Sequence, residues 1–396
     1  MYKTIRNYLF RLEPETAHHV TLQLMRLGSI EPITTVLRLL YWTPSKPVEA
    51  FGLKFRNPVG LAAGYDKDAV AIRGLSSLGF GHVEVGTVTP RPQPGNPKPR
   101  IFRLVEDDAV INRMGFPSQG SEFVQMQLNP LLKVGWVEQI IGIQPRALKR
   151  KTMKVHKGNS ILGVNIGKNK ETPNEEAVLD YLELLQNFAP YADYLAINIS
   201  SPNTVGLRQL QGRDALHGLL THLHAQRKLE EERLKKRIPL LVKLAPDLSE
   251  FELNDAVDVI IDTQMDGIIA TNTTLARDGL RSDARGETGG LSGVPLRLRS
   301  EAVLSQIVKR VDGRIPIVSA GGIHSPEDTK KRLAMGASLV QVYTGLIYEG
   351  PGLVRRIVKS LKDGRQRYLR WRLFLFRRSQ CRLWRFLATI LKEILW

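Results

Sequence analysis

Amide, hydroxyl and ammonium side chains recur directly after short apolar segments of this sequence. The residues at these segment ends are Gly64, Asp66 and Lys67; Thr87; Asn165; residues 198–203; Lys243; Thr271, Asn272 and Thr273; Gly321 and Gly322; and Tyr343, Thr344 and Gly345. Such side chains bind polar ligands through hydrogen bonds, and Lys67 and Lys243 add positive charge for an anion. Histidine and cysteine are absent from these positions, so the sequence predicts no metal site.

Four asparagines, Asn112, Asn198, Asn203 and Asn272, lie at or beside these segment ends. An asparagine side chain presents a hydrogen-bond donor and an acceptor side by side, which matches the N–H and C=O edge of a cyclic ureide such as a pyrimidine. A single asparagine of this kind is more often a turn or cap residue. Their common position indicates a pocket for such a ring.

Glycines follow the last two apolar segments, as Gly321-Gly322 and as the end of Tyr343-Thr344-Gly345. Glycine lets backbone N–H groups approach phosphate oxygens, and a helix N-terminus behind it adds a favourable dipole. A pair of tight turns would use the same residues. The place of Gly-Gly after the seventh segment favours a phosphate-binding site.

The apolar segments have the composition of strands buried on both faces, as in parallel sheets. They are VGLAAG (59–64), HVEVGT (82–87), ILGVNIG (161–167), DYLAINIS (193–200), IPLLVKL (238–244), DGIIATN (266–272), IPIVSAGG (315–322) and SLVQVYTG (338–345). Intervals such as 175–188, 249–262 and 326–335 can hold helices. Eight such units predict a closed (β/α)₈ barrel, with functional residues at the carboxyl ends of its strands. The alternative is an open doubly wound sheet, but no GxGxxG motif follows the first segment.

The chain of 396 residues exceeds the length of a barrel, which needs about 250 residues. Residues 1–45 are predicted to form two helices, and their periodicity alone favours simple packing on the main domain. The apolar stripes are Ile5, Leu9 and Leu12 in the first helix, and Ala17, Val20, Leu24 and Leu27 in the second, which Pro14 opens. Residues 131–159, a long basic connection, could form a lid, a disordered loop or an insertion without function.

The formal net charge is +18, of which +7 falls in residues 363–396. Such a chain could bind nucleic acid, acidic lipid or small anions. The sequence lacks the apolar run of about 18 residues that a transmembrane helix needs. Arg6, Arg11 and Glu13 interrupt the apolar core of a signal peptide, so we expect the protein to start near Met1 and stay inside the cell. The single cysteine, Cys381, excludes an intrachain disulfide.

Longer motifs surround the predicted strands. They are AAGYDKD (62–68), EVGTVTPRPQPGNPKPRIFRL (84–104), INRMGF (111–116), GVNIGKNK (163–170), INISSPNTVGLRQLQ (197–211), VKLAPDLS (242–249), IATNTT (269–274), TGGLSG (288–293) and GASLVQVYTGLIYEGP (336–351). Together they resemble dihydroorotate dehydrogenases, in matching order across residues 1–130 and 160–360. Within INISSPN, Ser201 stands where the soluble class carries a cysteine base. This serine and the N-terminal helices resemble the quinone-dependent, membrane-associated class.

The resemblance implies FMN as the cofactor, bound across the barrel mouth. Lys243 would face the pyrimidine edge of the flavin, where a cation stabilises the anionic reduced form. The FMN phosphate would lie near Gly293, Gly322, Tyr343 and Thr344. The other implied FMN contacts are Ala63, Gly64, Tyr65, Asp66, Lys67, Thr87, Asn165, Asn198 and Thr271.

The resemblance also implies dihydroorotate as substrate and orotate as product, in the biosynthesis of pyrimidines (UMP). Lys67 would pair with the substrate carboxylate. Ser201 would remove a proton from C5 while hydride leaves C6, and Thr204 is the nearest candidate to relay that proton. Without the surrounding motif, Ser201 would be interpreted as a capping serine in a loop. The other implied substrate contacts are Asn112, Arg113, Met114, Gly115, Phe116, Asn198, Asn203, Asn272 and Thr273.

A membrane quinone would then receive the electrons. In the family, helices like those predicted at 1–45 form an apolar tunnel to the flavin, whose inner end His18, Arg103 and Tyr343 would line here. Residues 46–362 would form the FMN-binding barrel. Since no targeting or anchor segment is evident, the resemblance favours a bacterial, peripheral protein on the cytoplasmic side of the inner membrane.

Two alternatives stay open at this point. A soluble dihydroorotate dehydrogenase would use fumarate or NAD, against which Ser201 and the N-terminal helices argue. A basic nucleic-acid-binding protein would use the arginines between 365 and 385. Because that function leaves the motifs at the strand ends unexplained, we expect no nucleic acid partner.

The tail at 363–396 begins where the family usually ends, near Leu361. Its apolar residues recur largely at three- or four-residue steps, with arginines mostly on the opposite face and Trp371, Trp384 and Trp396 suited to lipid headgroups. This pattern is typical of a basic interfacial helix on anionic lipid, although read-through sequence without a selected role is the alternative. Deleting 363–396 is expected to weaken sedimentation with anionic liposomes and to leave the FMN content unchanged. Unaltered sedimentation would reject a membrane role for the tail.

Overall fold

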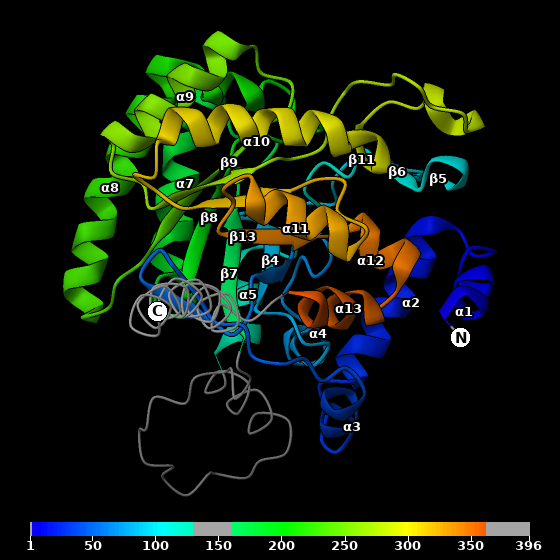
Figure 1. The fold of residues 1–396 in the computed structure, drawn as a ribbon. Helices are drawn as coiled ribbons and strands as arrows, with labels where there is room; N and C mark the ends of the chain where they lie inside the picture. The colour runs from blue at the N-terminus through cyan, green and yellow to red at the C-terminus, as the bar shows by residue number, and fades with distance from the viewer. Residues whose placement is uncertain (1, 130–159, 362–396) are drawn as a thin grey trace, which may run out of the picture. The chain divides into compact units, whose positions relative to one another are not determined.

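Eight parallel strands form a closed barrel in the computed structural model, which describes residues 2–129 and 160–361 (Figure 1). Around the barrel, the strands follow the order β10-β12-β13-β3-β4-β7-β8-β9. They are β3 (Val59–Leu61), β4 (His82–Val88), β7 (Ile161–Ile166), β8 (Tyr194–Asn198), β9 (Leu240–Leu244), β10 (Gly267–Ala270), β12 (Ile317–Ala320) and β13 (Leu339–Val342). Each coincides with one of the eight apolar segments, so the predicted (β/α)₈ barrel is confirmed.

Side chains alternate between the two faces of each barrel strand. In β4, Val83 and Val85 join the large apolar core between the strands and the surrounding helices. The intervening Glu84 instead makes hydrogen bonds inside the barrel. Because a strand has a side-chain period of two residues, one segment supplies both the apolar core and the polar interior.

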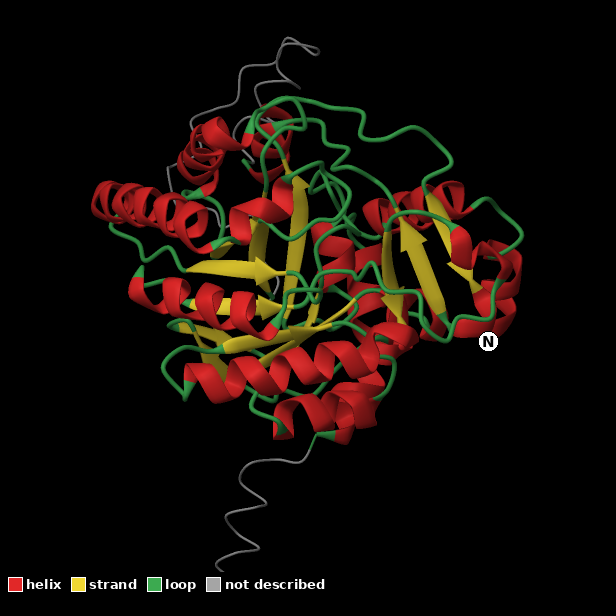
Figure 2. Cartoon of the chain, turned by 90° about the horizontal axis from the view of Figure 1, so that it is seen from above, coloured by secondary structure: helices red, strands yellow, loops and turns green. Residues whose placement is uncertain are grey.

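Helices cover the outside of the barrel (Figure 2). They are α4 (Ile72–Ser76), α5 (Ser121–Leu128), α7 (Ala177–Phe188), α8 (Arg213–Leu234), α9 (Glu250–Asp262), α10 (Arg297–Val311), α11 (Pro326–Ala334), α12 (Thr344–Glu349) and α13 (Gly352–Ser360). The intervals predicted to hold helices contain α7, α9 and α11. Ser249 and Ser325 begin α9 and α11 as capping boxes, which satisfy backbone N–H groups that the first helical turn leaves free.

Two small sheets complete the described chain. The hairpin of β1 (Val48–Ala50) and β2 (Leu53–Phe55) packs Phe51 and Phe55 onto inward-facing residues of the barrel such as Leu241. The antiparallel sheet of β5 (Ile101–Leu104), β6 (Ala109–Asn112) and β11 (Gly290–Gly293) lies beside the N-terminal helices (Figure 2). This second sheet carries Arg103, Asn112 and Gly293, which the sequence placed at the site.

The N-terminal segment forms three helices, α1 (Tyr2–Leu9), α2 (Pro14–Leu27) and α3 (Ile33–Leu40). The first two correspond to the predicted helices, and α3 was not predicted. Gly28 ends α2, and a new helix begins after Pro32. The Thr34 hydroxyl donates to the Gly28 carbonyl at 2.8 Å and fixes the turn between them.

The three helices bury only part of their apolar surface. Helix α2 contacts α4 and β5, and α1 contacts α12. The opposite side leaves large apolar residues exposed, including Leu24 (54%), Leu39 (73%) and Trp42 (56%). Within residues 2–129 and 160–361, no helix is both long and apolar enough to cross a membrane. The hypotheses on the connection at 131–159 and on the tail at 363–396 lie outside the described residues.

Candidate active site

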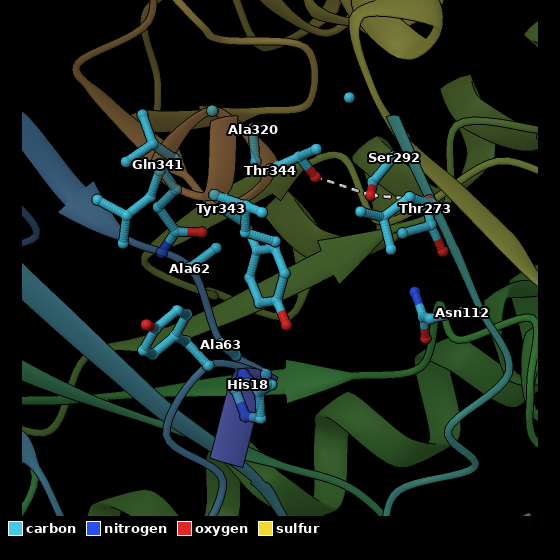
Figure 3. Close-up of a pocket in the computed structure, with 18 of the residues that line it drawn as sticks. His18, Ala62, Ala63, Asn112, Thr273, Ser292, Ala320, Gln341, Tyr343 and Thr344 are labelled. Atoms are coloured by element: carbon cyan, nitrogen blue, oxygen red, sulfur yellow. Dashed lines mark hydrogen bonds between the residues drawn. The ribbon is translucent and has the colours of Figure 1, made fainter. Parts of the chain in front are cut away.

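A cavity of about 670 Å³ lies at the carboxyl ends of the barrel strands and continues between α1 and α2 (Figure 3). Most residues predicted to bind cofactor or substrate line it, although they come from loops far apart in the sequence. Those that line it are Ala63, Gly64, Tyr65, Lys67, Thr87, Asn112, Met114, Gly115, Phe116, Asn198, Ser201, Asn203, Lys243, Thr271, Asn272, Thr273, Gly293, Gly322, Tyr343 and Thr344.

Three predicted contacts, Asp66, Arg113 and Asn165, are not among the residues that line the cavity. The buried Asp66 carboxylate accepts from the backbone N–H groups of Val70 and Ala71 at 2.9 and 2.8 Å, and burial raises its pKa to about 6. The Arg113 guanidinium donates to the Glu287 carboxylate at 2.6 Å and does not line the cavity.

Asn165 connects the barrel interior to the cavity wall. Its Oδ1 atom accepts from the Thr87 hydroxyl at 2.6 Å and from the Asn198 amide at 3.0 Å. The Asn198 amide also donates to the Thr87 hydroxyl at 2.9 Å. Since all three side chains are buried, this triangle holds Thr87 and Asn198 in fixed orientations at the cavity.

A second group of amides faces the other wall. The Asn203 amide donates to Asn112 Oδ1 at 3.2 Å, and the Asn272 amide donates to the Ser200 hydroxyl at 3.0 Å. Asn203 Oδ1 is buried and finds no hydrogen-bond partner among the described residues. This oxygen is therefore an acceptor available to an N–H group of a ligand.

Ser201 lies in the loop between these amides and is buried. Its Oγ atom accepts from the backbone N–H of Asn203 at 3.2 Å, which leaves the hydroxyl proton free to be donated. The Thr204 hydroxyl, two residues after Pro202, is buried and has no partner within the part of the chain that is described. The loop thus brings the Ser201 hydroxyl to the cavity, whereas Thr204 in the same loop does not line it.

Two lysines supply positive charge to the cavity. The Lys67 ammonium donates to the Gly64 carbonyl at 2.8 Å, and burial lowers its pKa to about 8. Lys243 extends from β9 into the barrel, where burial lowers its pKa and the nearby Glu84 carboxylate opposes that shift. The two oppositely charged groups are 4.0 Å apart.

Glu84, His82, Tyr194 and Gln341 were not predicted as functional, although they form a polar cluster inside the barrel. Glu84 accepts from Tyr194 and Gln341, and Gln341 also lies 3.5 Å from His82. The sequence did indicate such a cluster, because a glutamate and a histidine interrupt the apolar segment 82–87. Burial of such side chains in a strand is costly unless hydrogen-bond or ion-pair partners surround them.

Glycines shape the end of the cavity where the sequence predicts a phosphate-binding site. Gly293, Gly321 and Gly322 have φ angles of +102°, +105° and +73°, which other residues rarely adopt. An added Cβ atom at Gly345 would overlap the carbonyl oxygen of Ile323, so these chain segments touch through their backbones. The Thr344 hydroxyl donates to the Ser292 hydroxyl at 2.8 Å beside them (Figure 3).

The apolar end of the cavity is lined by the N-terminal helices. The His18 ring packs edge-on against Tyr65, with ring centres 5.1 Å apart, and Tyr65 packs against Tyr343. Burial lowers the pKa of His18 to about 3, so its ring is neutral near pH 7. Arg103 donates to the carbonyls of Phe10 and Leu12, and this contact joins β5 to the end of α1.

The comparisons with known proteins agree on one family. Residues 46–364 match the family model described as dihydroorotate dehydrogenase. Relatives named dihydroorotate dehydrogenase (quinone) from Halorhodospira halophila and Idiomarina loihiensis are 48% and 46% identical, over 91% of this chain and 97% and 100% of theirs. The crystal structure of DHODH from Eimeria tenella in complex with ferulenol is 42% identical, with a TM-score of 0.75, over 88% of this chain and 90% of that chain.

The pKa of Lys67 predicts how anion binding depends on pH. Its ammonium is charged below pH about 8, so affinity for a carboxylate ligand such as orotate should be full there. As the pH rises through this value, the charge is lost and the dissociation constant should increase, approaching about tenfold per pH unit. Isothermal titration calorimetry with orotate measures this dependence.

The matched control is Lys67→Arg, whose guanidinium stays charged throughout this range. It should bind orotate more weakly but with a flatter pH profile. If the unmodified protein binds orotate equally well between about pH 7 and 10, Lys67 does not supply the charge that holds the ligand.

Proposed function

Because the chain belongs to the dihydroorotate dehydrogenase family, we propose that it oxidises dihydroorotate to orotate in this cavity and delivers the electrons to a quinone. The observation that carries the proposal is the continuity of the cavity. It extends from the amides around Ser201 to apolar residues of α1 and α2, such as Leu9 and Leu24. One end suits a polar, anionic ring, and the other suits a hydrophobic electron acceptor.

The family is flavin-dependent, and the cavity fits FMN. The glycines at 293, 321 and 322 line the cavity with backbone that could bind a phosphate, and the small side chains of Ala62, Ala63 and Ala320 leave space for a flat ring. Lys243 would face the pyrimidine edge of that ring. When bound, the flavin would accept the hydride and later release the electrons. The contacts proposed for the cofactor are Ala63, Gly64, Tyr65, Lys67, Thr87, Asn198, Thr271, Gly293, Gly322, Tyr343 and Thr344.

Asp66 and Asn165 would serve this site from behind the cavity wall. Asp66 fixes the loop that carries Gly64 and Lys67, through its bonds to Val70 and Ala71. Asn165 orients Thr87 and Asn198. Removing either side chain would displace the groups that touch the ligand without removing them.

The substrate would lie between Lys67 and the amide groups. Lys67 pairs with its carboxylate, while Asn112, Asn203 and Asn272 hold the ring amides through donors and acceptors. The other contacts proposed are Met114, Gly115, Phe116, Asn198 and Thr273. Arg113 would stabilise this wall, because its guanidinium packs 4.5 Å from the Phe102 ring and pairs with Glu287.

Ser201 would be the base of the reaction. Its hydroxyl oxygen accepts the proton from C5 as hydride leaves C6, which forms the C5–C6 double bond of orotate. A serine needs an acceptor for its own proton. The buried Thr204 hydroxyl, which lacks a partner among the described groups, would pass that proton on.

The exposed apolar face of the N-terminal helices would attach the protein to a lipid surface, on the cytoplasmic side of the inner membrane. Ile5 and Leu24 both line the cavity and are 49% and 54% exposed, so they mark an opening at this face. Arg26 and Arg38 are exposed on the same segment and suit anionic headgroups. A quinone could then enter directly from lipid.

Blocking the apolar end should separate the two half-reactions. Ala17 is buried and lines the cavity on α2, so Ala17→Phe would fill the path to the quinone. Quinone reduction is expected to fall by about tenfold or more, whereas flavin bleaching by dihydroorotate should stay within about twofold. Val20→Phe, on the exposed side of the same helix, is the control and should change neither rate. Equal loss of both half-reactions in the folded Ala17→Phe protein would contradict the assignment of this path.

Replacing Ser201 tests the chemical step. Ser201→Ala removes the base but keeps Lys67 and the amides, so dihydroorotate affinity should change little. Flavin reduction should slow by about 10²–10⁴-fold, the usual contribution of a positioned general base. Ser201→Cys should retain activity with a pH profile shifted toward thiol ionisation, near a reference pKa of about 8.5.

Single-turnover flavin bleaching in stopped flow measures this step, with the affinity determined separately. Near-normal bleaching in Ser201→Ala would show that another group takes the C5 proton. A protein that contains no flavin, or does not bleach on addition of dihydroorotate, would overturn the proposed function itself.

A further inference from the structure

Glu84 lies inside the barrel and has no part in the function proposed so far. None of its surface is exposed (0%). Its Oε2 atom accepts from the Tyr194 hydroxyl at 2.9 Å and from the Gln341 amide at 2.8 Å. Its Oε1 atom accepts from the Asn165 amide at 2.9 Å and lies 4.0 Å from the Lys243 ammonium. A carboxylate with this many partners so close to a cofactor site calls for a functional explanation.

The surroundings of Glu84 suit its ionised form. Every polar neighbour presents a donor, so a proton on the carboxyl group would face another proton. Burial raises the pKa of Tyr194 well above its usual value and lowers that of His82 to about 3, which keeps both neutral near pH 7. Asn165 and Gln341 carry no charge. Within the described part of the chain, Lys243 is therefore the charged group that faces Glu84 from the elements around it.

Two connections lead from Glu84 to the cavity. The first is electrostatic, because Lys243 lines the cavity and Glu84 is its buried counter-ion. The second is orientational, because Asn165 donates to Glu84 and thereby turns its Oδ1 atom toward Thr87 and Asn198. Both connections end at side chains proposed to contact the flavin.

We infer that Glu84 is a positioning residue that sets the reduction potential of the bound FMN through Lys243. Its carboxylate holds the ammonium in place and offsets part of its charge. This inference rests on the FMN site proposed above.

The consequence follows from charge balance. Reduction adds negative charge to the flavin beside Lys243. With Glu84 present, Lys243 keeps its proton in both oxidation states. In Glu84→Gln the counter-ion is gone, so the buried Lys243 loses its proton more readily while the flavin is oxidised. It regains that proton when the flavin becomes negative, and reduction is then coupled to proton uptake.

The experiment measures the midpoint potential of bound FMN as a function of pH in the unmodified protein and in Glu84→Gln. The variant should show one additional proton per two electrons over the part of the pH range in which Lys243 gains a proton on flavin reduction. This corresponds to a tenfold change in the reduction equilibrium per pH unit, or about 30 mV. At the acid end, where Lys243 is protonated in both states, the potential should exceed that of the unmodified protein by at least about 30 mV, a tenfold change in the same equilibrium.

Glu84→Gln should preserve most of the local hydrogen bonds. Gln341 Oε1 is buried without a partner among the described residues, so this amide can turn and accept from the new one. The matched control is Tyr194→Phe, which removes a hydrogen bond to Glu84 but no charge. A purely structural role for Glu84 predicts similar effects of the two variants, whereas the proposal predicts that Tyr194→Phe keeps the original pH dependence.

A Lys243→Met background completes the test. There, Glu84→Gln should add no proton uptake, because the group that takes up the proton is gone. If Glu84→Gln alone fails to retain flavin, the double variant should restore flavin binding, because it leaves no unpaired buried charge. The inference would be overturned by unchanged midpoint potentials in Glu84→Gln, or by the same additional proton uptake in the Lys243→Met background. It would also be overturned if Glu84→Gln and the double variant both failed to retain flavin. An unmodified protein that contains flavin and bleaches with dihydroorotate keeps the proposed function intact in all these cases.

Discussion

The buried carboxylate of Glu84 constrains the barrel interior, because desolvating a charge costs several kcal/mol unless donors surround it. Strands β7, β8, β9 and β13 meet this requirement with Asn165, Tyr194, Lys243 and Gln341. Because the Asn165 amide donates to Glu84, its carbonyl oxygen is turned toward Thr87 and Asn198 and accepts from both. The orientation of Thr87 and Asn198 at the cavity therefore depends on the Glu84 carboxylate inside the barrel. The apolar side chains of the same strands pack into the helix-covered core, which fixes the polar side chains on the inner face.

The two ends of the cavity are also joined mechanically, outside the barrel. Glu15 on α2 forms an ion pair with the buried Arg100 at 2.7 Å. Arg100 in turn donates to the carbonyl of Asn96 at 2.9 Å, and the Asn96 amide donates to the carbonyl of Asn203 at 3.2 Å. The helix that lines the apolar end thus holds the loop that carries Asn203. Loss of the Glu15 carboxylate would leave the buried Arg100 guanidinium without its ion-pair partner, which is energetically costly. The position of α2 is therefore coupled to the loop that carries Asn203.

The sequence allowed the barrel and most of the cavity to be predicted, because parallel strands bring their carboxyl ends together whatever the loops do. It could not separate residues that touch a ligand from those that support them. Asp66 stands in the same motif as Gly64, and Asn165 ends a strand segment as Asn198 does, so only the three-dimensional partners distinguish them. Glu84 was not predicted for a related reason, because the valines of segment 82–87 indicate a buried strand and give no role to the glutamate between them. The third N-terminal helix was not predicted: α3 follows α2 after the short connection from Gly28 to Pro32.

The N-terminal helices carry apolar side chains both toward the cavity and on the exposed surface. Their inner residues, such as Ala17, are buried against the cavity, while Leu39, Leu40 and Trp42 are 73%, 57% and 56% exposed. Full burial of one such side chain is worth about 1.5–3 kcal/mol, so under the proposed membrane attachment a few of them inserted into lipid would suffice without a spanning helix. The same insertion would close the mouth at Ile5 and Leu24 to water. An apolar acceptor could then reach Tyr65 and Tyr343 through lipid alone, and the polar substrate would have to use the other side of the cavity. Under the proposed function, the separation of the two reactants would thus follow from where the apolar side chains are exposed.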